Sequence, residues 1–207
     1  MSRYTGPKNR IARRFGVNIF GKKRNPLIHK LHPPGAHGPK RKKKSDSEFG
    51  LQLMEQQKIK AVYGMLSKKQ LVKYYEQSLS QPGNTNHLLL QKLETRLDNI
   101  VYRLGFAATI FQARQLVTHG HIRVDSKKVD IPSFAVRPGM NLSLSEKAQK
   151  MKQIQQALNS QESLPEYLTC DAKKMEGELI AIPNEEAIEH PLPINVALVC
   201  EFLAHNG

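Results

Sequence analysis

The clearest chemical signal in the sequence is a run of positive charge near its amino-terminal end. Residues 1–44 contain 14 Lys and Arg side chains and no Asp or Glu, and the run closes in "GPKRKKKSDSE" at residues 38–48. Tyr4, Phe15 and Phe20 stand among these cations. Cations neutralise phosphates and aromatic rings stack on bases. The combination therefore predicts a surface for nucleic acid.

Two simpler interpretations of this basic arm, defined as residues 1–44, are a solvated tail and a nuclear localisation signal, since "KRKKK" fits the latter pattern. The length of the stretch without acids favours nucleic acid over both. Like charges repel, so a segment without counter-charge does not fold on itself. We therefore expect residues 1–44 to be largely disordered in the free protein and to become ordered on a polyanion.

The charge changes sign along the chain. The whole sequence has 32 Lys and Arg against 18 Asp and Glu, a formal charge of +14, whereas residues 155–207 have 2 cations and 9 anions. Phosphate would repel this acidic end. We expect residues 176–189 to point away from nucleic acid, toward a basic neighbouring protein.

Hydrophobic spacing predicts the elements that position the cations. Two helices follow the arm, with N-caps offered by residues 45–47 and by Ser67, and "QPGNTN" at 81–86 ends the second. A further helix is predicted by apolar residues at helical spacing from Leu89 to Leu104, with Gly105 ending it in a left-handed cap. Another runs from Thr109, with Gln112 completing a capping box, to Gly120.

The hydrophobic period then changes from 3.6 to 2. "HIRVDSKKVDI" at 121–131 predicts a β-hairpin turning at Asp125-Ser126-Lys127, and Leu142 and Leu144 share one face of a strand that follows a Pro138-Gly139 turn. Residues 147–160 are again helical in pattern, and 177–183 are predicted to form a strand. The last apolar run, 194–204, fits a buried strand or a buried helix equally by spacing.

Six cations would line the outer surface of this helix–helix–hairpin unit. A protein that binds A-form RNA matches its shape and neutralises its phosphates, because the deep major groove offers side chains little. An ordinary solvated face is the alternative. The cations are Arg96, Arg103 and Arg114 on the helices and Arg123, Lys127 and Lys128 on the hairpin.

The stretch "LETRLDNIVYRLGFAATIFQARQLVTHGHIRVDSKKVDI" resembles the RNA-binding helix–helix–hairpin module called the α-L motif. "MSRYTGPKNRIARRFG", "PGAHGPKRKKKSDSEFGLQLMEQQKIKAVYGMLSKKQ" and "LTCDAKKMEGELIAIP" extend the resemblance to the bacterial small-subunit ribosomal protein S-four family over nearly the whole chain. It implies an α+β fold with a basic arm, an all-helical domain and the α-L module in a second domain with a small antiparallel sheet. The C-terminal run would be a helix packing back on the helical domain.

The resemblance also implies a function and partners. Members bind the 5′ domain of small-subunit rRNA, nucleate assembly of the subunit, contact ribosomal protein S-five at an interface associated with translational accuracy, and flank the path by which mRNA enters. Some repress their own mRNA, and a translational repressor is the alternative function. We expect a cytoplasmic protein located in the small ribosomal subunit.

We divide the chain into an arm (1–44), a helical domain (45–92, completed by 191–207), the α-L module (93–157) and a sheet extension with the acidic segment (158–190). The predicted RNA-binding residues are cations together with one aromatic and one amide side chain. They are Arg3, Tyr4, Lys8, Arg10, Arg13, Arg14, Lys22, Lys23, Arg24, Lys40, Arg41, Lys42, Lys43, Lys44, Lys58, Lys60, Arg96, Asn99, Arg103, Arg114, Arg123, Lys127 and Lys128.

Enzyme, metal and membrane functions are not expected. Pseudouridine synthases carry an essential Asp in an Arg-Leu-Asp triplet, but "TRLDN" lies inside the first helix of the module, where Asp98 would orient Arg96 and Arg103. Some relatives bind zinc through cysteines in the arm, whereas this arm has only His29, His32 and His37. No cofactor is implied.

No apolar stretch approaches the roughly 18–20 residues of a membrane span, and the apolar core of a signal peptide is missing. Cys170 and Cys200 are expected to be reduced thiols in the cytosol.

Overall fold

The computed structural model describes residues 4–21, 25, 27–39, 47–160 and 163–206. The chain forms two compact units, Met1–Asn86 with His190–Gly207, and His87–Glu189. The boundary between them falls after Asn86, whereas the sequence led us to expect it after residue 92. The second unit holds the predicted helix–helix–hairpin module and the sheet.

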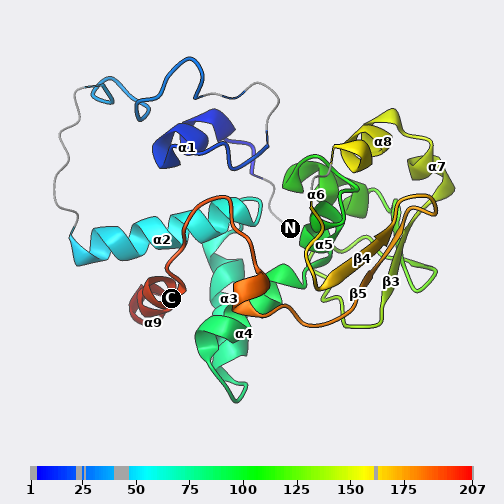
Figure 1. Cartoon of the computed structure of the whole chain (residues 1–207). Helices are drawn as coiled ribbons and strands as arrows, with labels where there is room; N and C mark the ends of the chain where they lie inside the picture. The colour runs from blue at the N-terminus through cyan, green and yellow to red at the C-terminus, as the bar shows by residue number, and fades with distance from the viewer. Residues whose placement is uncertain (1–3, 22–24, 26, 40–46, 161–162, 207) are drawn as a thin grey trace. The chain divides into compact units, whose positions relative to one another are not determined.

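The first unit is helical (Figure 1). It contains α1 (Lys8–Phe15), α2 (Glu48–Val62), α3 (Lys68–Leu79) and α9 (Val196–Asn206). The predicted N-caps form, since the Ser47 hydroxyl accepts from the Gly50 N–H and the Ser67 hydroxyl accepts from the Gln70 N–H. α9 packs on α2 and α3, so the C-terminal run is the helix that the resemblance implied.

The described part of the arm is more ordered than we predicted. Residues 8–15 form α1, and Gly16 closes it with a φ of 69°. The Arg13 guanidinium donates to the backbone oxygens of His32 and Pro33 at 3.0–3.2 Å. Ile19 and Phe20 are buried. These local contacts offset the repulsion on which the prediction of disorder depended, so that prediction is wrong for this part of the arm.

The helix predicted from Leu89 to Leu104 is divided in two, α4 (Thr85–Glu94) and α5 (Leu97–Arg103). Arg96 has an extended backbone, with φ −64° and ψ 137°. Its neighbours bond to the later segment 132–136 instead of continuing the helix: the Leu97 N–H donates to the Phe134 oxygen at 2.9 Å, and the Val136 N–H donates to the Thr95 oxygen at 2.9 Å. Pairing between segments distant in the sequence therefore replaces one turn of helix.

The second unit combines α5 and α6 (Ile110–Thr118) with a five-stranded antiparallel sheet (Figure 1). The strand order is β2-β1-β3-β5-β4. Short helices α7 (Glu146–Gln149) and α8 (Lys152–Asn159) connect β3 to β4, and a 3₁₀ turn η1 spans Glu185–Ala187. The strands are β1 (Ile122–Val124), β2 (Lys127–Lys128), β3 (Asn141–Leu144), β4 (Leu168–Asp171) and β5 (Glu176–Leu179). The α+β prediction is confirmed.

One face of this sheet packs on α5. Leu142 and Leu144 are buried, as their alternation predicted. Gly177 of β5 lies so close to Leu104 that a Cβ there would be 2.6 Å from its Cδ2. Only glycine lets the helix approach β5 this closely. The core comprises residues of α5, α6 and every strand except β2, among them Leu97, Ile100, Leu104, Val117, Ile122, Leu142, Leu168 and Leu179.

Thr109 caps α6 as predicted. Its hydroxyl oxygen accepts from the Gln112 N–H at 3.2 Å, and the Gln112 side chain accepts from the Ala108 N–H at 3.2 Å. We expect Thr109→Ala to lower the free energy of unfolding by about 1 kcal/mol, because one N–H of the first turn loses its acceptor. Urea denaturation measures this difference. Thr109→Ser is the control and should stay close to the original value; equal losses in both variants would contradict the role of the hydroxyl.

Both cysteines are free thiols, as predicted. Burial, followed by the nearby Glu201 carboxylate, raises the pKa of Cys200 to about 11. Burial and then Asp171 also raise the pKa of Cys170. The thiolate is the reactive form, so the raised pKa values disfavour reaction at both thiols.

Candidate nucleic-acid interface

The predicted RNA-binding residues divide into three groups. One group lies outside the described residues, a second is turned inward or engaged within the protein, and a third is exposed or half-buried at the surface. The first group is Arg3, Lys22, Lys23, Arg24, Lys40, Arg41, Lys42, Lys43 and Lys44. Their role stays a prediction.

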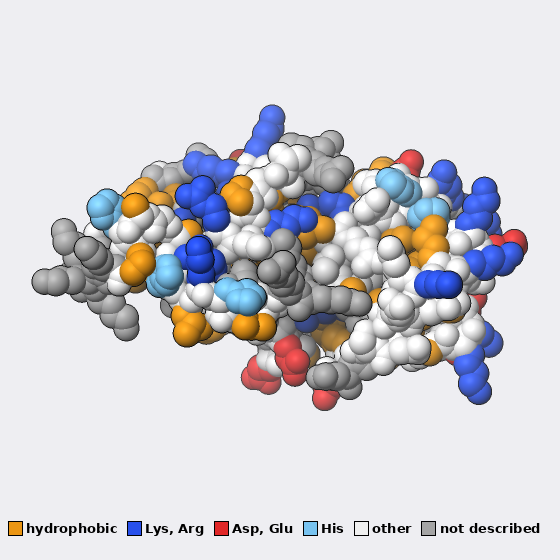
Figure 2. Space-filling view, turned by 90° about the horizontal axis from the view of Figure 1, so that it is seen from above, with side chains coloured by type: hydrophobic (Ala, Val, Ile, Leu, Met, Phe, Trp, Pro, Cys, Tyr) orange, Lys and Arg blue, Asp and Glu red, His pale blue; other side chains and the backbone are white. Residues whose placement is uncertain are grey.

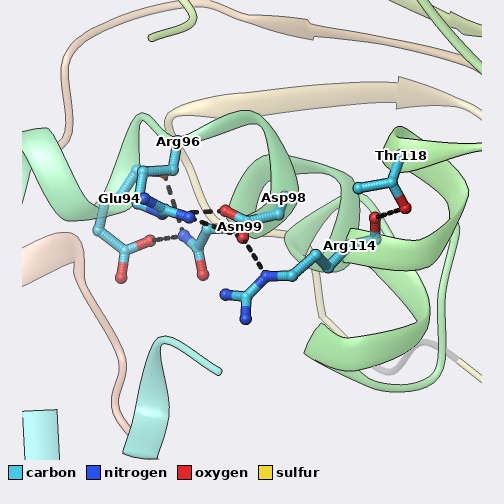
Figure 3. A network of polar contacts seen from close by, with 6 residues as sticks. All are labelled: Glu94, Arg96, Asp98, Asn99, Arg114 and Thr118. Atoms are coloured by element: carbon cyan, nitrogen blue, oxygen red, sulfur yellow. Dashed lines mark hydrogen bonds and ion pairs between the residues drawn. The ribbon is translucent and has the colours of Figure 1, made fainter. Parts of the chain in front are cut away.

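Arg96 is turned inward, so its predicted place on the outer surface is wrong. The side chain is 1% exposed, and its Nε and Nη2 donate to the two carboxylate oxygens of Asp98 at 3.0 and 2.8 Å (Figure 3). The same carboxylate accepts from Arg114 Nε at 2.9 Å, across from α5 to α6. Asp98 therefore orients Arg96 and Arg114, not Arg96 and Arg103 as the sequence suggested.

Glu94 forms a second buried network, and two of its partners, Asn99 and Arg103, were predicted to face outward. Its carboxylate is fully buried and accepts from Asn99 Nδ2, from Arg103 Nη2 at 3.0 Å and from the Tyr167 hydroxyl at 3.3 Å. Burial and then the Glu94 charge raise the pKa of Tyr167. Asn99 is 3% exposed, so its place on the outer surface is also corrected. Both corrections have one cause: a buried carboxylate needs cations and donors around it.

The hairpin carries three of the exposed cations of this unit. Arg123, Lys127 and Lys128 are exposed. Asp125 and Ser126 form the turn with φ of 47° and 67°, the geometry of a two-residue type I′ hairpin. The predicted hairpin is therefore confirmed, but its turn has two residues and not three, because Lys127 begins β2 and pairs with Val124.

The outer face of the sheet changes charge from one edge to the other. Residues paired across antiparallel strands project to the same side. Arg123 pairs with Lys128 on one side and with Ser143 on the other, and Glu176 pairs with Ser143 and with Asp171. One row across the sheet therefore runs from two cations at β2 and β1 to two anions at β5 and β4. Phosphate would approach the β2–β1 edge and be repelled at the β4 edge.

In the first unit, Arg10 and Arg14 of α1 are exposed, whereas Tyr4 and Lys8 are half-buried. Lys58 is engaged within the protein, since its Nζ lies 2.6 Å from Glu55 Oε1 and donates to the Pro193 oxygen at 3.1 Å. Burial, then Lys68, lowers the pKa of Lys60.

Several exposed cations were not among the predicted residues, and three of them lie together on and beside α7 and α8. Lys147 on α7, Lys150 after it and Lys152 at the start of α8 are all exposed. Figure 2 shows Lys and Arg side chains gathered over the part of the second unit that holds the sheet and these short helices. The sequence contained a sign of this group, because three lysines within six residues follow Glu146 without a further acid.

Among the described residues, no cluster of three or more His, Cys, Asp or Glu side chains could hold a metal ion. No helix in the described ranges is long and apolar enough to cross a membrane.

Two helices, a cationic hairpin and a sheet that extends it define the class: an RNA-binding module of the S4 type joined to a helical domain. Residues 95–142 match the S4 domain, and residues 3–94 match the Ribosomal protein S4/S9 N-terminal domain.

Full-length relatives agree with these matches. The chain is 58% identical over 207 residues to small ribosomal subunit protein uS4 of Protochlamydia amoebophila (strain UWE25), with 100% of both chains covered. It is 56% identical over 209 residues to the protein of that name in Chlamydia trachomatis serovar D, with 99% of each covered. The chain belongs to the uS4 family of small ribosomal subunit proteins. The family prediction is confirmed, and the class is a structural ribosomal protein and not an enzyme.

Proposed function

We propose that this chain is a cytoplasmic structural constituent of the small ribosomal subunit that binds the 5′ domain of small-subunit rRNA directly and nucleates assembly of the particle. The observation that carries the proposal is the distribution of charge. The acid-free arm and the β2–β1 edge of the sheet hold exposed cations, and the anions lie at the opposite edge.

The basic arm and the hairpin would contribute to RNA binding in different ways. Arg10 and Arg14 on α1 belong to a segment rich in cations, which RNA attracts over a distance through its phosphates. The hairpin is held by a rigid turn and by the sheet, so Arg123 and Lys128 meet phosphates at a fixed spacing. Phosphate contacts of this kind position the protein, and the shape of the RNA selects the site.

We also propose a protein partner for the acidic edge. Glu176 and Asp171 are paired neighbours on the outer face, and Glu178 follows on the same face of β5. A surface that repels phosphate suits a basic protein segment. Ribosomal protein S-five is the partner that the family resemblance implies, with a contribution to translational accuracy, and mRNA would pass nearby.

The salt dependence of binding tests the main proposal. We expect the affinity of the full chain for a transcript of the 5′ domain to fall with salt, with log affinity against log salt at a slope of about −7 to −9 if roughly ten phosphates are engaged. Filter binding at several salt concentrations measures the slope. A transcript of another rRNA domain is the control for selectivity. A slope near −2, or equal affinity for both transcripts, would contradict the proposal.

A further inference from the structure

The turn that joins α6 to β1 contains a glycine with a left-handed backbone. Gly120 has a φ of 70°. Its N–H donates to the Val117 oxygen at 2.8 Å, and the His121 N–H donates to the Leu116 oxygen at 3.0 Å. These bonds form the Schellman arrangement that closes a helix. Asparagine and, at some cost, other residues also occupy this position in helices, so the left-handed backbone strains a side chain here without excluding it.

The side chain of Lys128 occupies the space that a side chain at position 120 would need. A Cβ on Gly120 would lie 2.0 Å from Cε of Lys128, 2.7 Å from its Nζ and 3.2 Å from its Cδ. The aliphatic part of the Lys128 side chain therefore packs over the α-carbon of Gly120, which carries no side chain. This places the ammonium group at the C-terminal end of α6, where the partial negative charge of the helix favours a cation.

The hairpin fixes which lysine reaches this place. The two-residue turn at Asp125 and Ser126 sets the register in which Lys128 pairs with Arg123, and the Val129 N–H donates to the Ile122 oxygen at 3.2 Å. Lys127, one residue earlier, pairs with Val124 and projects to the other side of the strand. Only one of the two lysines of β2 can therefore cross Gly120.

We propose that Gly120 is a positioning residue for RNA binding: it holds the ammonium of Lys128 at the junction of α6 and β1, next to Arg123, where the two cations meet phosphates. The proposal rests on the proposed RNA-binding function. A lysine in water samples many rotamers, and ordering it on binding costs conformational entropy. The close approach to Gly120 restricts Lys128 before RNA arrives.

A side chain at position 120 would displace the lysine and not the backbone of the hairpin. The atoms that would clash are at the far end of a flexible side chain, so they can move away cheaply. The protein would stay folded, and the ammonium would lose its fixed position. The variant is therefore predicted to bind RNA as if Lys128 were absent.

The experiment compares Gly120→Ala, Lys128→Ala and the double variant in the full chain, with a transcript of the 5′ domain of small-subunit rRNA. Gly139→Ala is the matched control, because Gly139 also has a positive φ, 84°, but nothing lies within 4 Å of the added Cβ. We expect Gly120→Ala and Lys128→Ala each to weaken binding by about two- to fivefold, the range of one exposed ion pair. Each should reduce the magnitude of the salt slope by about 0.7–0.9.

The double variant decides the question. We expect it to bind no more weakly than Lys128→Ala alone, whereas Gly139→Ala binds like the original chain. Effects of Gly120→Ala and Lys128→Ala that multiply, or Gly120→Ala binding like Gly139→Ala, would overturn the proposal. If the original chain binds RNA and Lys128→Ala does not change the affinity, the positioning role of Gly120 is wrong but the proposed RNA-binding function still stands. If the original chain does not bind the transcript, the proposed function fails.

If the Gly120→Ala variant does not fold, Gly120→Asn replaces it, because asparagine tolerates this backbone and still adds a Cβ.

Discussion

Replacing Asp98 by alanine is expected to lower the free energy of unfolding by about 3–5 kcal/mol. Arg96 is 1% exposed, and both of its bonds to Asp98 lie within 3.0 Å. In the variant, a buried guanidinium loses its carboxylate while water stays excluded. The ion pair with Arg114, at 2.9 Å, is removed as well, and with it a polar contact between α5 and α6 that adds to their apolar packing. Urea denaturation followed by circular dichroism measures the change.

Two control variants separate the buried pair from a general effect of charge. Asp130→Ala removes an exposed carboxylate from the same unit and should change stability by no more than about 0.5 kcal/mol. Arg114→Ala removes the partly exposed cation, 15% exposed, and should cost less than Asp98→Ala. A loss below about 1 kcal/mol for Asp98→Ala would show that the carboxylate is not structurally required.

Local signals in the sequence predicted local structure well. Ser47, Ser67 and Thr109 cap the helices that they were expected to cap, because a cap depends on residues within one turn. The hairpin turn followed from Asp125 and Ser126 for the same reason. The C-terminal run could not be assigned from spacing, since β-branched residues fit either structure, and it took the resemblance to identify a helix.

Features that depend on distant segments were missed. The break at Arg96 exists because segment 132–136 pairs with residues 95–97, and no pattern around Arg96 itself contains that partner. The helical period continues through the break, so periodicity predicted one helix. Arg13 of α1 likewise donates to backbone oxygens at His32 and Pro33, 19 and 20 residues further along the chain.

In the candidate site, too, the local features were predicted and those that depend on distant partners were missed. The sequence identified cations correctly but could not say which of them bind carboxylates within the protein. Glu94 and Asp98, placed among Arg96 and Arg103, were the available sign that part of this positive charge is neutralised inside. The hairpin cations have no acid in the same strands, and the structure leaves all three of them exposed.

Deleting residues 1–44 is expected to weaken binding to the 5′-domain transcript by about a hundredfold or more at moderate salt. The deleted segment contains 14 of the 32 Lys and Arg residues and no acid. Each phosphate without its cation retains its counterions, so both the affinity and its dependence on salt decrease. We expect the magnitude of the slope to fall by well over half, from the value of about 7–9 estimated for roughly ten phosphates, because the deletion removes Arg10, Arg14 and the other arm cations as well as Lys40–Lys44. The α-L module and its hairpin account for what remains.

A charge variant of the full chain is the matched test, because it leaves the arm in place. Replacing Lys40, Arg41, Lys42, Lys43 and Lys44 by glutamine removes five cations and should lower the magnitude of the slope by about 3.5–4.5, at about 0.7–0.9 for each phosphate that is no longer neutralised. Replacing Lys173 and Lys174, two exposed lysines beside Asp171 at the acidic edge, should leave the slope unchanged. If the arm deletion and the glutamine variant both bind with the original slope, phosphate does not supply the counter-charge of the arm. The absence of acids from residues 1–44 would then need another cause, and the proposed direct contact with rRNA would have to depend on the hairpin alone.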